Sequence, residues 1–266
     1  MSTMDLGQLE EKFFLTSSEA ENAVLIMPAA DLLNEEKLLH VLNTYGPLIQ
    51  AQERPEAAAF FISWYAILCS ALHYMMFHRA DKVIDLSFSN VTLQLVVEGS
   101  YPLFSFKLNN NRYIEIPSVE RSEWMNRTME SFYKEQLTPL IQLLARLARV
   151  NPTVLWGQVV NTAYDLLEEE LSEASVEEHK QAIIHHFHTR LADIDASAFG
   201  LSINPFAKKR IFIEDPADSN RTIALKSACC LAYCLPHRLN MTFNYCYTCP
   251  RLKEKDRAIM KANGQY

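Results

Sequence analysis

The sequence predicts an α+β protein in which an antiparallel β-meander packs on a helical bundle, followed by a small cysteine-rich C-terminal module. Alternating apolar residues between 83 and 116 indicate consecutive short strands. Apolar residues at helical spacing predominate before and after these strands. Five of the six cysteines lie within 229–249, which sets the C-terminal region apart from the rest of the chain.

Charge divides the chain in the same way. The protein has 266 residues, of which 49 % are hydrophobic, and this is enough for one large domain with a small addition. After position 207 lie 11 of the 25 Lys and Arg residues but only 5 of the 32 Asp and Glu residues. We therefore predict a larger domain over 1–207 and a module over 208–266.

Composition excludes several classes of protein. The net charge of −7 does not favour nucleic acid as a partner. The chain has only 6 glycines and none are clustered, so a glycine-rich nucleotide-binding loop is not expected. The N-terminus has no basic start and no early apolar core, so we expect no secretory signal and a protein of the reducing cytoplasm. A peripheral position at the inner face of the membrane stays open.

The first half of the chain begins with a segment in which we expect no regular structure before the apolar run at 23–27. A helix is predicted over 31–42, and Gly46 with Pro47 is expected to stop it. Residues 57–76 form a long uncharged run that could span a bilayer, but the run contains serine, histidine and tyrosine. We therefore favour a buried core helix, in which Cys69 packs as a small hydrophobic residue.

Strands follow this helix, and helices follow the strands. The predicted strands of the meander cover 83–88, 91–97, 103–108 and 112–116. The predicted helices of the bundle cover 119–135, 138–149, 152–174 and 176–192. A hairpin is expected where 210–215 and 222–225 flank a turn at 216–220.

Two groups of side chains within these helices have alternative interpretations. Trp64 and Trp156 are expected to pack in the core, with a role in lining a cleft as the alternative. In the run His185-His186-Phe187-His188, the first and last histidines share a helix face, as two metal ligands would. A polar helix surface is the interpretation that we favour for this run.

The cysteine pattern carries the most chemical information. Cys246 and Cys249 form a Cys-x-x-Cys pair whose sulfurs can bind one metal ion, and Cys229 with Cys230 is a second pair. Adjacent cysteines do not easily share a tetrahedral zinc, whereas four thiolates in two pairs suit a 2Fe–2S cluster. A structural zinc site and a redox dithiol remain alternatives. Cys234 is either a ligand in place of Cys230 or a free thiol.

Basic residues surround this pattern and would stabilise a negatively charged cluster. A solvated basic helix is the alternative for those near the C-terminal end. These residues are Lys226, His237, Arg238, Arg251, Lys253, Lys255 and Arg257.

The adjacent cysteines at 229–230, followed by Cys246-x-x-Cys249-Pro250, resemble the C-terminal cluster domain of the FhuF-like ferric siderophore reductases. Weaker similarity extends over most of 55–252 and includes Trp64-Tyr65 and the Leu-Trp-Gly at 155–157. The spacer between the two cysteine pairs is 15 residues, longer than in the family pattern, and Cys234 stands where the family has a basic residue.

This resemblance implies a 2Fe–2S cluster held by Cys229, Cys230, Cys246 and Cys249. It implies a larger domain similar to the palm-like part of siderophore synthetases. The implied activity is one-electron reduction of Fe(III) in a hydroxamate-type siderophore, which releases Fe(II) in the cytoplasm. Because the chain has no flavin or nicotinamide motif, the electron donor would be a ferredoxin, a flavodoxin or an NAD(P)H-dependent reductase. The alternative function is a non-enzymatic iron–sulfur or structural zinc protein that acts as a redox sensor or interaction module.

Overall fold

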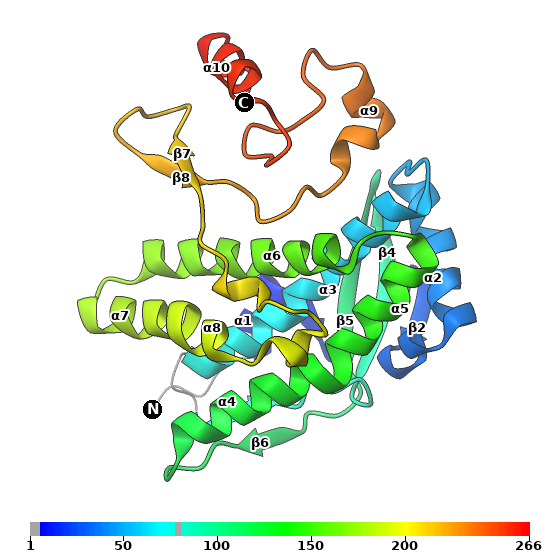
Figure 1. Ribbon diagram of the computed structural model, residues 1–266. Helices are drawn as coiled ribbons and strands as arrows, with labels where there is room; N and C mark the ends of the chain where they lie inside the picture. The colour runs from blue at the N-terminus through cyan, green and yellow to red at the C-terminus, as the bar shows by residue number, and fades with distance from the viewer. Residues whose placement is uncertain (1–5, 78–80) are drawn as a thin grey trace.

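The computed structural model describes residues 6–77 and 81–266 and has an α+β fold. Figure 1 shows that the chain forms two parts. The larger part comprises the described residues up to 207 and contains a four-stranded sheet and the helices α1 to α8. The C-terminal part, residues 208–266, contains the β7–β8 hairpin, α9 and α10, and lies over α6.

The main sheet has four strands in the order β1-β5-β4-β2. β4 (Val91–Glu98) and β5 (Tyr101–Leu108) form the predicted antiparallel hairpin, and Gly99 closes it at a φ of 62° that a residue without Cβ adopts readily. β2 (Ala23–Pro28) adds to β4 in antiparallel orientation, and the short β1 (Leu15–Thr16) adds to β5 in parallel.

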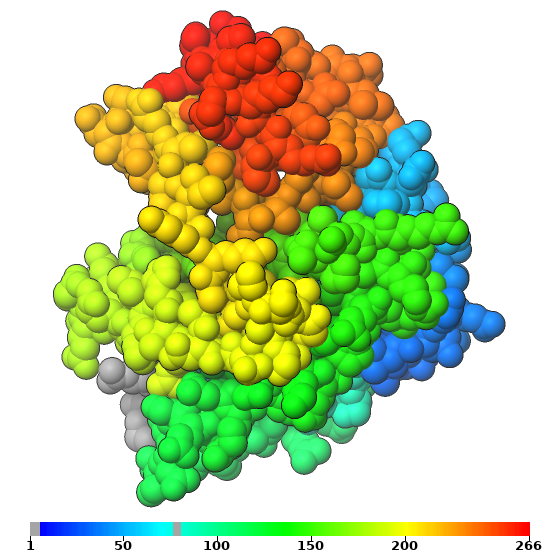
Figure 2. All heavy atoms as spheres, in the orientation of Figure 1, coloured from blue at the N-terminus to red at the C-terminus, as the bar shows by residue number. Residues whose placement is uncertain are grey.

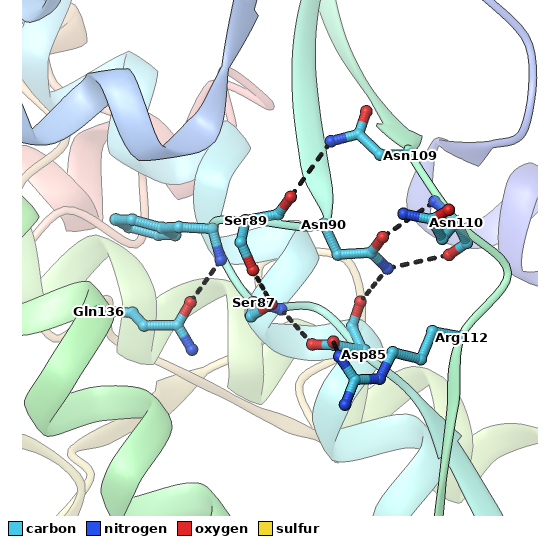
Figure 3. Close-up of polar contacts among 9 residues, drawn as sticks. Asp85, Ser87, Ser89, Asn90, Asn109, Asn110, Arg112 and Gln136 are labelled. Carbon is cyan, nitrogen blue, oxygen red and sulfur yellow. Dashed lines mark hydrogen bonds and ion pairs between the residues drawn. The ribbon is translucent and has the colours of Figure 1, made fainter.

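The outer strands differ from the predicted meander. β3 (Lys82–Ile84) and β6 (Tyr113–Glu115) pair with each other in a separate two-stranded sheet, instead of flanking β4 and β5. The physical reason is a polar network at the loops on either side of the hairpin (Figure 3). Buried Asn90 donates to the carbonyl oxygens of Asp85 (2.8 Å) and Asn110 (3.0 Å) and accepts from the Asn110 amide (2.9 Å). These bonds satisfy backbone groups that a continuous sheet ladder would otherwise use.

The N-terminal segment is also more ordered than predicted. α1 (Leu6–Phe13) precedes β1, and the side chains of Leu9, Phe13 and Leu15 are buried in the core. The expectation of no regular structure before 23 was wrong, because one helical turn of apolar spacing is too short to stand out from a mixed sequence. Burial against α3 and β5 supplies the stabilisation that local propensity does not.

The bundle helices lie where their apolar spacing predicts them, within a few residues. α2 begins after the Asn34 N-cap and continues through Gly46 and Pro47 for one residue beyond the predicted stop. Two π-helical turns, η2 and η3, interrupt the helices at positions that the sequence does not mark. The bounds are α2 Glu35–Leu48, α3 Arg54–Phe77, α4 Arg121–Ser131, η2 Phe132–Leu137, α5 Thr138–Ala148, α6 Pro152–Glu173, α7 Glu177–His185, η3 His186–Arg190 and α8 Leu191–Asp193.

The long apolar helix α3 is the centre of the larger part, and it contacts α1, α2, α5 and α6. It is the one helix of the described chain that is long and apolar enough to cross a membrane, and 72 % of its most apolar window is buried inside the protein. Cys69 is packed in this core, as predicted. Trp156 is also buried, and the half-buried Trp64 donates to the Tyr45 hydroxyl at 3.1 Å.

The buried apolar residues form two separate clusters. The large cluster runs from Leu9 to Phe206 and fills the larger part. The small cluster lies in the C-terminal part, where β7 (Phe212–Glu214) and β8 (Thr222–Ala224) form the predicted hairpin and α10 (Glu254–Ala262) packs against the cysteine-bearing loops. Its buried members are Cys229, Tyr247, Cys249, Leu252 and Met260.

Candidate metal centre

The predicted cysteine ligands come from two loops of the C-terminal part. Cys229 and Cys230 follow β8 in a loop that crosses α6, and Cys246 and Cys249 lie in a turn before α10. Cys229 and Cys249 are buried, whereas Cys230 and Cys246 are half-buried. The two loops lie side by side, since the Lys226 amide donates to the Thr248 carbonyl oxygen at 3.0 Å.

Helix α6 holds the first loop. The Gln158 side chain donates to the carbonyl oxygen of Cys229 at 3.2 Å, and the Asn161 side chain accepts from the Ser227 amide at 2.7 Å and donates to the Ala228 carbonyl oxygen at 3.3 Å. The approach is close because of Gly157, where a Cβ atom would lie 2.2 Å from the Cβ of Ala228. The hydrogen bonds from Gln158 and Asn161 and the close packing at Gly157 therefore fix the residues before Cys229 against α6. The sequence did not predict this role of the three α6 residues. The one sequence feature that could have indicated this close packing is Gly157, a glycine inside a helix of larger residues.

A buried arginine holds the second loop. Arg257 of α10 is only 4 % exposed, and its guanidinium donates to the carbonyl oxygens of Tyr247 (3.1 Å), Cys249 (3.1 Å) and Leu252 (3.4 Å). It also pairs with Glu254 in the same helix. The planar guanidinium thus satisfies three carbonyl groups of one turn at once, which fixes the backbone around Cys249. Arg257 is therefore buried, and the alternative of a solvated basic helix was wrong for this residue.

The thiol of Cys249 lies close enough to those of Cys229 and Cys246 to shift their pKa values. A hydrogen bond from Cys249 lowers the pKa of Cys229 despite burial, and that same bond raises the pKa of Cys249. Cys246 in turn donates to Cys249, and this bond together with burial raises the pKa of Cys246. The structure therefore brings Cys229, Cys246 and Cys249 together from two loops that the sequence separates.

Positive charge lies beside these sulfurs. Burial alone would lower the pKa of Lys226, but the negative potential of Cys246 and Cys230 outweighs it and the net pKa is raised. This places the Lys226 ammonium next to both cysteine pairs. The Arg251 guanidinium acts on Cys229 in the same sense and donates to the Tyr233 hydroxyl at 2.8 Å. Cations in these positions stabilise thiolates.

The cysteines of the two loops supply four sulfur donors, those of Cys229, Cys230, Cys246 and Cys249. Among residues 6–77 and 81–266, no group of three or more His, Cys, Asp or Glu side chains is arranged to hold one metal ion. Cys249 interacts with both Cys229 and Cys246, and Cys230 adjoins Cys229 in the chain. A cluster of two irons takes four cysteine ligands, so this donor set and the cations beside it suit that group.

Cys234 lies in a different environment. It belongs to a short turn, η6 (Ala232–Cys234), and its thiol interacts with the Tyr233 side chain and with Glu56 at the start of α3. Burial and the Glu56 carboxylate raise the pKa of this thiol. Of the two interpretations of Cys234, this placement favours the free thiol.

A cavity of about 740 Å³ opens beside Cys246. Its walls carry the basic residues His237 and Arg238 and the apolar residues Met241 and Phe243. In Figure 2 the orange and red residues that form these walls make up a lobe on top of the larger part. The cavity therefore gives a bound molecule access to one of the candidate ligands.

The histidine run does not form a metal site in the described structure. His185 and His186 both line a second cavity, and the buried His186 has its Nε2 atom 3.1 Å from His73 Nδ1. His188 instead packs on the Tyr164 ring. The π turn η3 widens the helix at this point, so His185 and His188 no longer lie on one face as α-helical spacing predicts.

No protein-family model matches the chain, and no curated protein sequence matches it. The resemblance to the FhuF-like reductases therefore stays a prediction that rests on the motif residues alone.

Proposed function

We propose that the C-terminal part holds a 2Fe–2S cluster through Cys229, Cys230, Cys246 and Cys249, and that the protein reduces ferric siderophores, of the hydroxamate type, in the cytoplasm. The observation that carries this proposal is the proximity of three thiols from two loops beside a cavity that reaches Cys246. When bound, such a cluster supplies one electron at a time. Within this proposal, the larger part is the palm-like domain.

The chemistry of the substrate explains why one electron is sufficient. Fe(III) is a hard Lewis acid that oxygen chelators hold tightly, whereas Fe(II) binds the same oxygen ligands more weakly. Reduction therefore releases the metal without breaking a covalent bond of the chelator. Electrons would come from a ferredoxin, a flavodoxin or an NAD(P)H-dependent reductase.

The chain's own residues have three tasks in this proposal. The cavity beside Cys246 positions the chelate, and Arg238 with His237 attracts chelates that carry negative charge. Lys226 stabilises negative charge on the sulfurs from a partly buried position. The contacts from α6 and Arg257 fix the two loops, so that the four cysteines stay close when charge is gained or lost.

The decisive experiment is anaerobic purification or reconstitution with iron and sulfide, followed by analysis of iron, acid-labile sulfide and the visible spectrum. We expect a red-brown protein whose bands bleach with dithionite, and which reduces a ferric hydroxamate in the presence of a ferrous trap. Cys246→Ser and Cys249→Ser should abolish colour and reduction. Colourless protein, or coloured protein that reduces no ferric hydroxamate or catecholate, would contradict the proposal.

A structural zinc site is the second candidate, and the size of the C-terminal core favours it. Five buried residues form that core, and a core this small usually needs a metal or a disulfide to remain folded. Metal analysis separates the two candidates, because a colourless protein with one zinc per chain and no labile sulfide would support the structural site. In that case the protein would act as a redox sensor or interaction module.

A further inference from the structure

A second cavity, of about 620 Å³, lies in the larger part between α4, α7 and the π turn η3. Figure 1 places α4 and α7 at the end of the larger part that is remote from the cysteine-bearing loops. Two arginines, Arg121 and Arg190, line this cavity together with the apolar side chains of Met76, Met125 and Ala182. Its volume is within the usual range of about 300–1,000 Å³ for small-molecule sites.

The π turn η3 places Arg190 in this cavity. Its closing bond runs from the Leu191 amide to the His186 carbonyl oxygen, five residues back. In an uninterrupted α-helix, Arg190 would follow Gln181 by about two and a half turns and would lie on the opposite face. The wider turn rotates Arg190 back, so that it lines the same cavity as Gln181 and His185. Such turns are rare and occur frequently at functional sites.

Arg190 is half-buried, and its contacts are with neutral groups. One guanidinium nitrogen donates to the Ser122 hydroxyl at 3.0 Å, and another lies 3.6 Å from the Met125 sulfur. Within the part of the chain that the structure describes, no carboxylate forms an ion pair with Arg190. Burial and the nearby charge of Arg121 lower the pKa of Arg190. Glu178 also lines the cavity and reduces, without removing, the excess of positive charge there.

The inner wall of the cavity is rigid and neutral. His186 lines it, and behind it His73 bridges His186 and Tyr133, with Nε2 of His73 2.5 Å from the Tyr133 hydroxyl. Burial lowers the pKa of His73 to about 3 and lowers that of His186 well below its ordinary value. His73 and His186 are therefore neutral near neutral pH, whereas Arg121 and Arg190 supply positive charge to the site.

We propose that this cavity binds a small amphipathic anion, with its carboxylate or phosphate head against Arg190 and Arg121 and its apolar body between the methionines. A guanidinium with donors to spare binds a carboxylate or a phosphate through two parallel hydrogen bonds. Met76 and Met125 supply flexible apolar contacts that adapt to the shape of a bound chain. The site uses none of the cysteines, so it is independent of the proposed function.

Isothermal titration calorimetry with octanoate tests the site, with octan-1-ol as the neutral probe of the same length. We expect octanoate to bind the full-length protein at least tenfold more tightly than octan-1-ol. Arg190→Gln should weaken octanoate binding about tenfold and leave octan-1-ol unchanged. Arg127→Gln is the matched control, because Arg127 is an exposed α4 arginine that pairs with Glu123 at 3.8 Å. Equal octanoate affinity of Arg190→Gln and the unaltered protein would overturn the proposal.

A second variant distinguishes binding of the ligand's apolar body from binding of its anionic head, and it does not change the charge of the cavity. Ala182→Leu narrows the cavity and should weaken octanoate, while inorganic phosphate should still bind if the natural ligand is a phosphate. If the unaltered protein binds inorganic phosphate and Arg190→Gln does not, this result supports the site and identifies phosphate as the head group of its ligand. If neither octanoate nor inorganic phosphate binds the folded, unaltered protein, the proposal fails.

Discussion

The larger part and the C-terminal part are stabilised in different ways. In the larger part, side chains such as Phe61 and Leu144 are completely buried, and α3 is surrounded by other helices and the sheet. The C-terminal part has five buried core residues, and two of them, Cys229 and Cys249, are also candidate ligands. Apolar burial alone supports the fold of the larger part. In the C-terminal part, the same residues contribute both to the core and to the candidate metal site.

This difference leads to the largest expected effect, that of Cys249→Ser. Serine replaces the thiol of a buried candidate ligand that interacts with both Cys229 and Cys246, so we expect the C-terminal part to lose any bound metal and its order together. Hydrogen exchange should show loss of protection over 208–266 with protection retained in α3 and α6. Uniform loss of protection across both parts would show that they fold as one unit.

Acid should destabilise the larger part. Burial lowers the pKa of His73 to about 3, so the folded protein keeps this ring neutral while the unfolded chain protonates it below about 6.5. The stability that this residue contributes is therefore complete above pH 6.5 and is lost as the pH falls from there toward 3. Melting temperatures at pH 7.5 and pH 5 should differ less in His73→Phe than in the unaltered protein. His40→Gln, an exposed histidine on α2, is the control and should leave the difference unchanged.

Two helix glycines give a matched pair for the contact between the two parts. In Gly157→Ala the new Cβ would lie 2.2 Å from the Cβ of Ala228, so we expect a cost of about 1–3 kcal/mol and displacement of the Cys229 loop. Gly46→Ala places its Cβ 3.5 Å from the nearest side chain, and we expect a change of less than about 1 kcal/mol, because the clash of a new Cβ with the ring of Pro47 opposes the gain in helix propensity. Chemical denaturation measures both changes, and metal content should fall only in Gly157→Ala. A loss of metal in Gly46→Ala would argue against a specific role for α6.

The smallest effect is expected for Cys234→Ser. Its thiol interacts with Glu56 and Tyr233, so metal content and visible spectrum should match those of the unaltered protein. A clear loss of bound metal would instead assign Cys234 as a ligand in place of Cys230.

Local patterns explain what the sequence predicted correctly. Helices α4 to α7 have apolar spacing that repeats over several turns, and α3 is a long apolar run. The β4–β5 hairpin has alternating apolar residues, and its two strands are close in sequence. The pairing of β3 with β6 and of β1 with β5 joins residues distant in sequence, and polar loops such as that of Asn90 decide it. Single-sequence periodicity carries no information about such pairings.

The candidate site shows the same limit. Cysteine spacing identifies the thiols, because few other structures need five cysteines so close together. The contacts of Gln158, Asn161 and Arg257 with the cysteine loops were not predictable, since each bonds to backbone carbonyl groups that any sequence provides. The burial of His186 was missed because a π turn leaves no mark on apolar spacing.

The packing of the Cys229 loop against α6 has a consequence for protein engineering. A chimera that transplants 208–266 onto a foreign scaffold leaves behind Gly157, Gln158 and Asn161, which lie in a different stretch of chain. The graft would carry all four candidate ligands and still lack the helix that positions Cys229 and Cys230. A transplantable unit must therefore also include the first half of α6, in which Gly157 leaves room for the loop that contains Ala228.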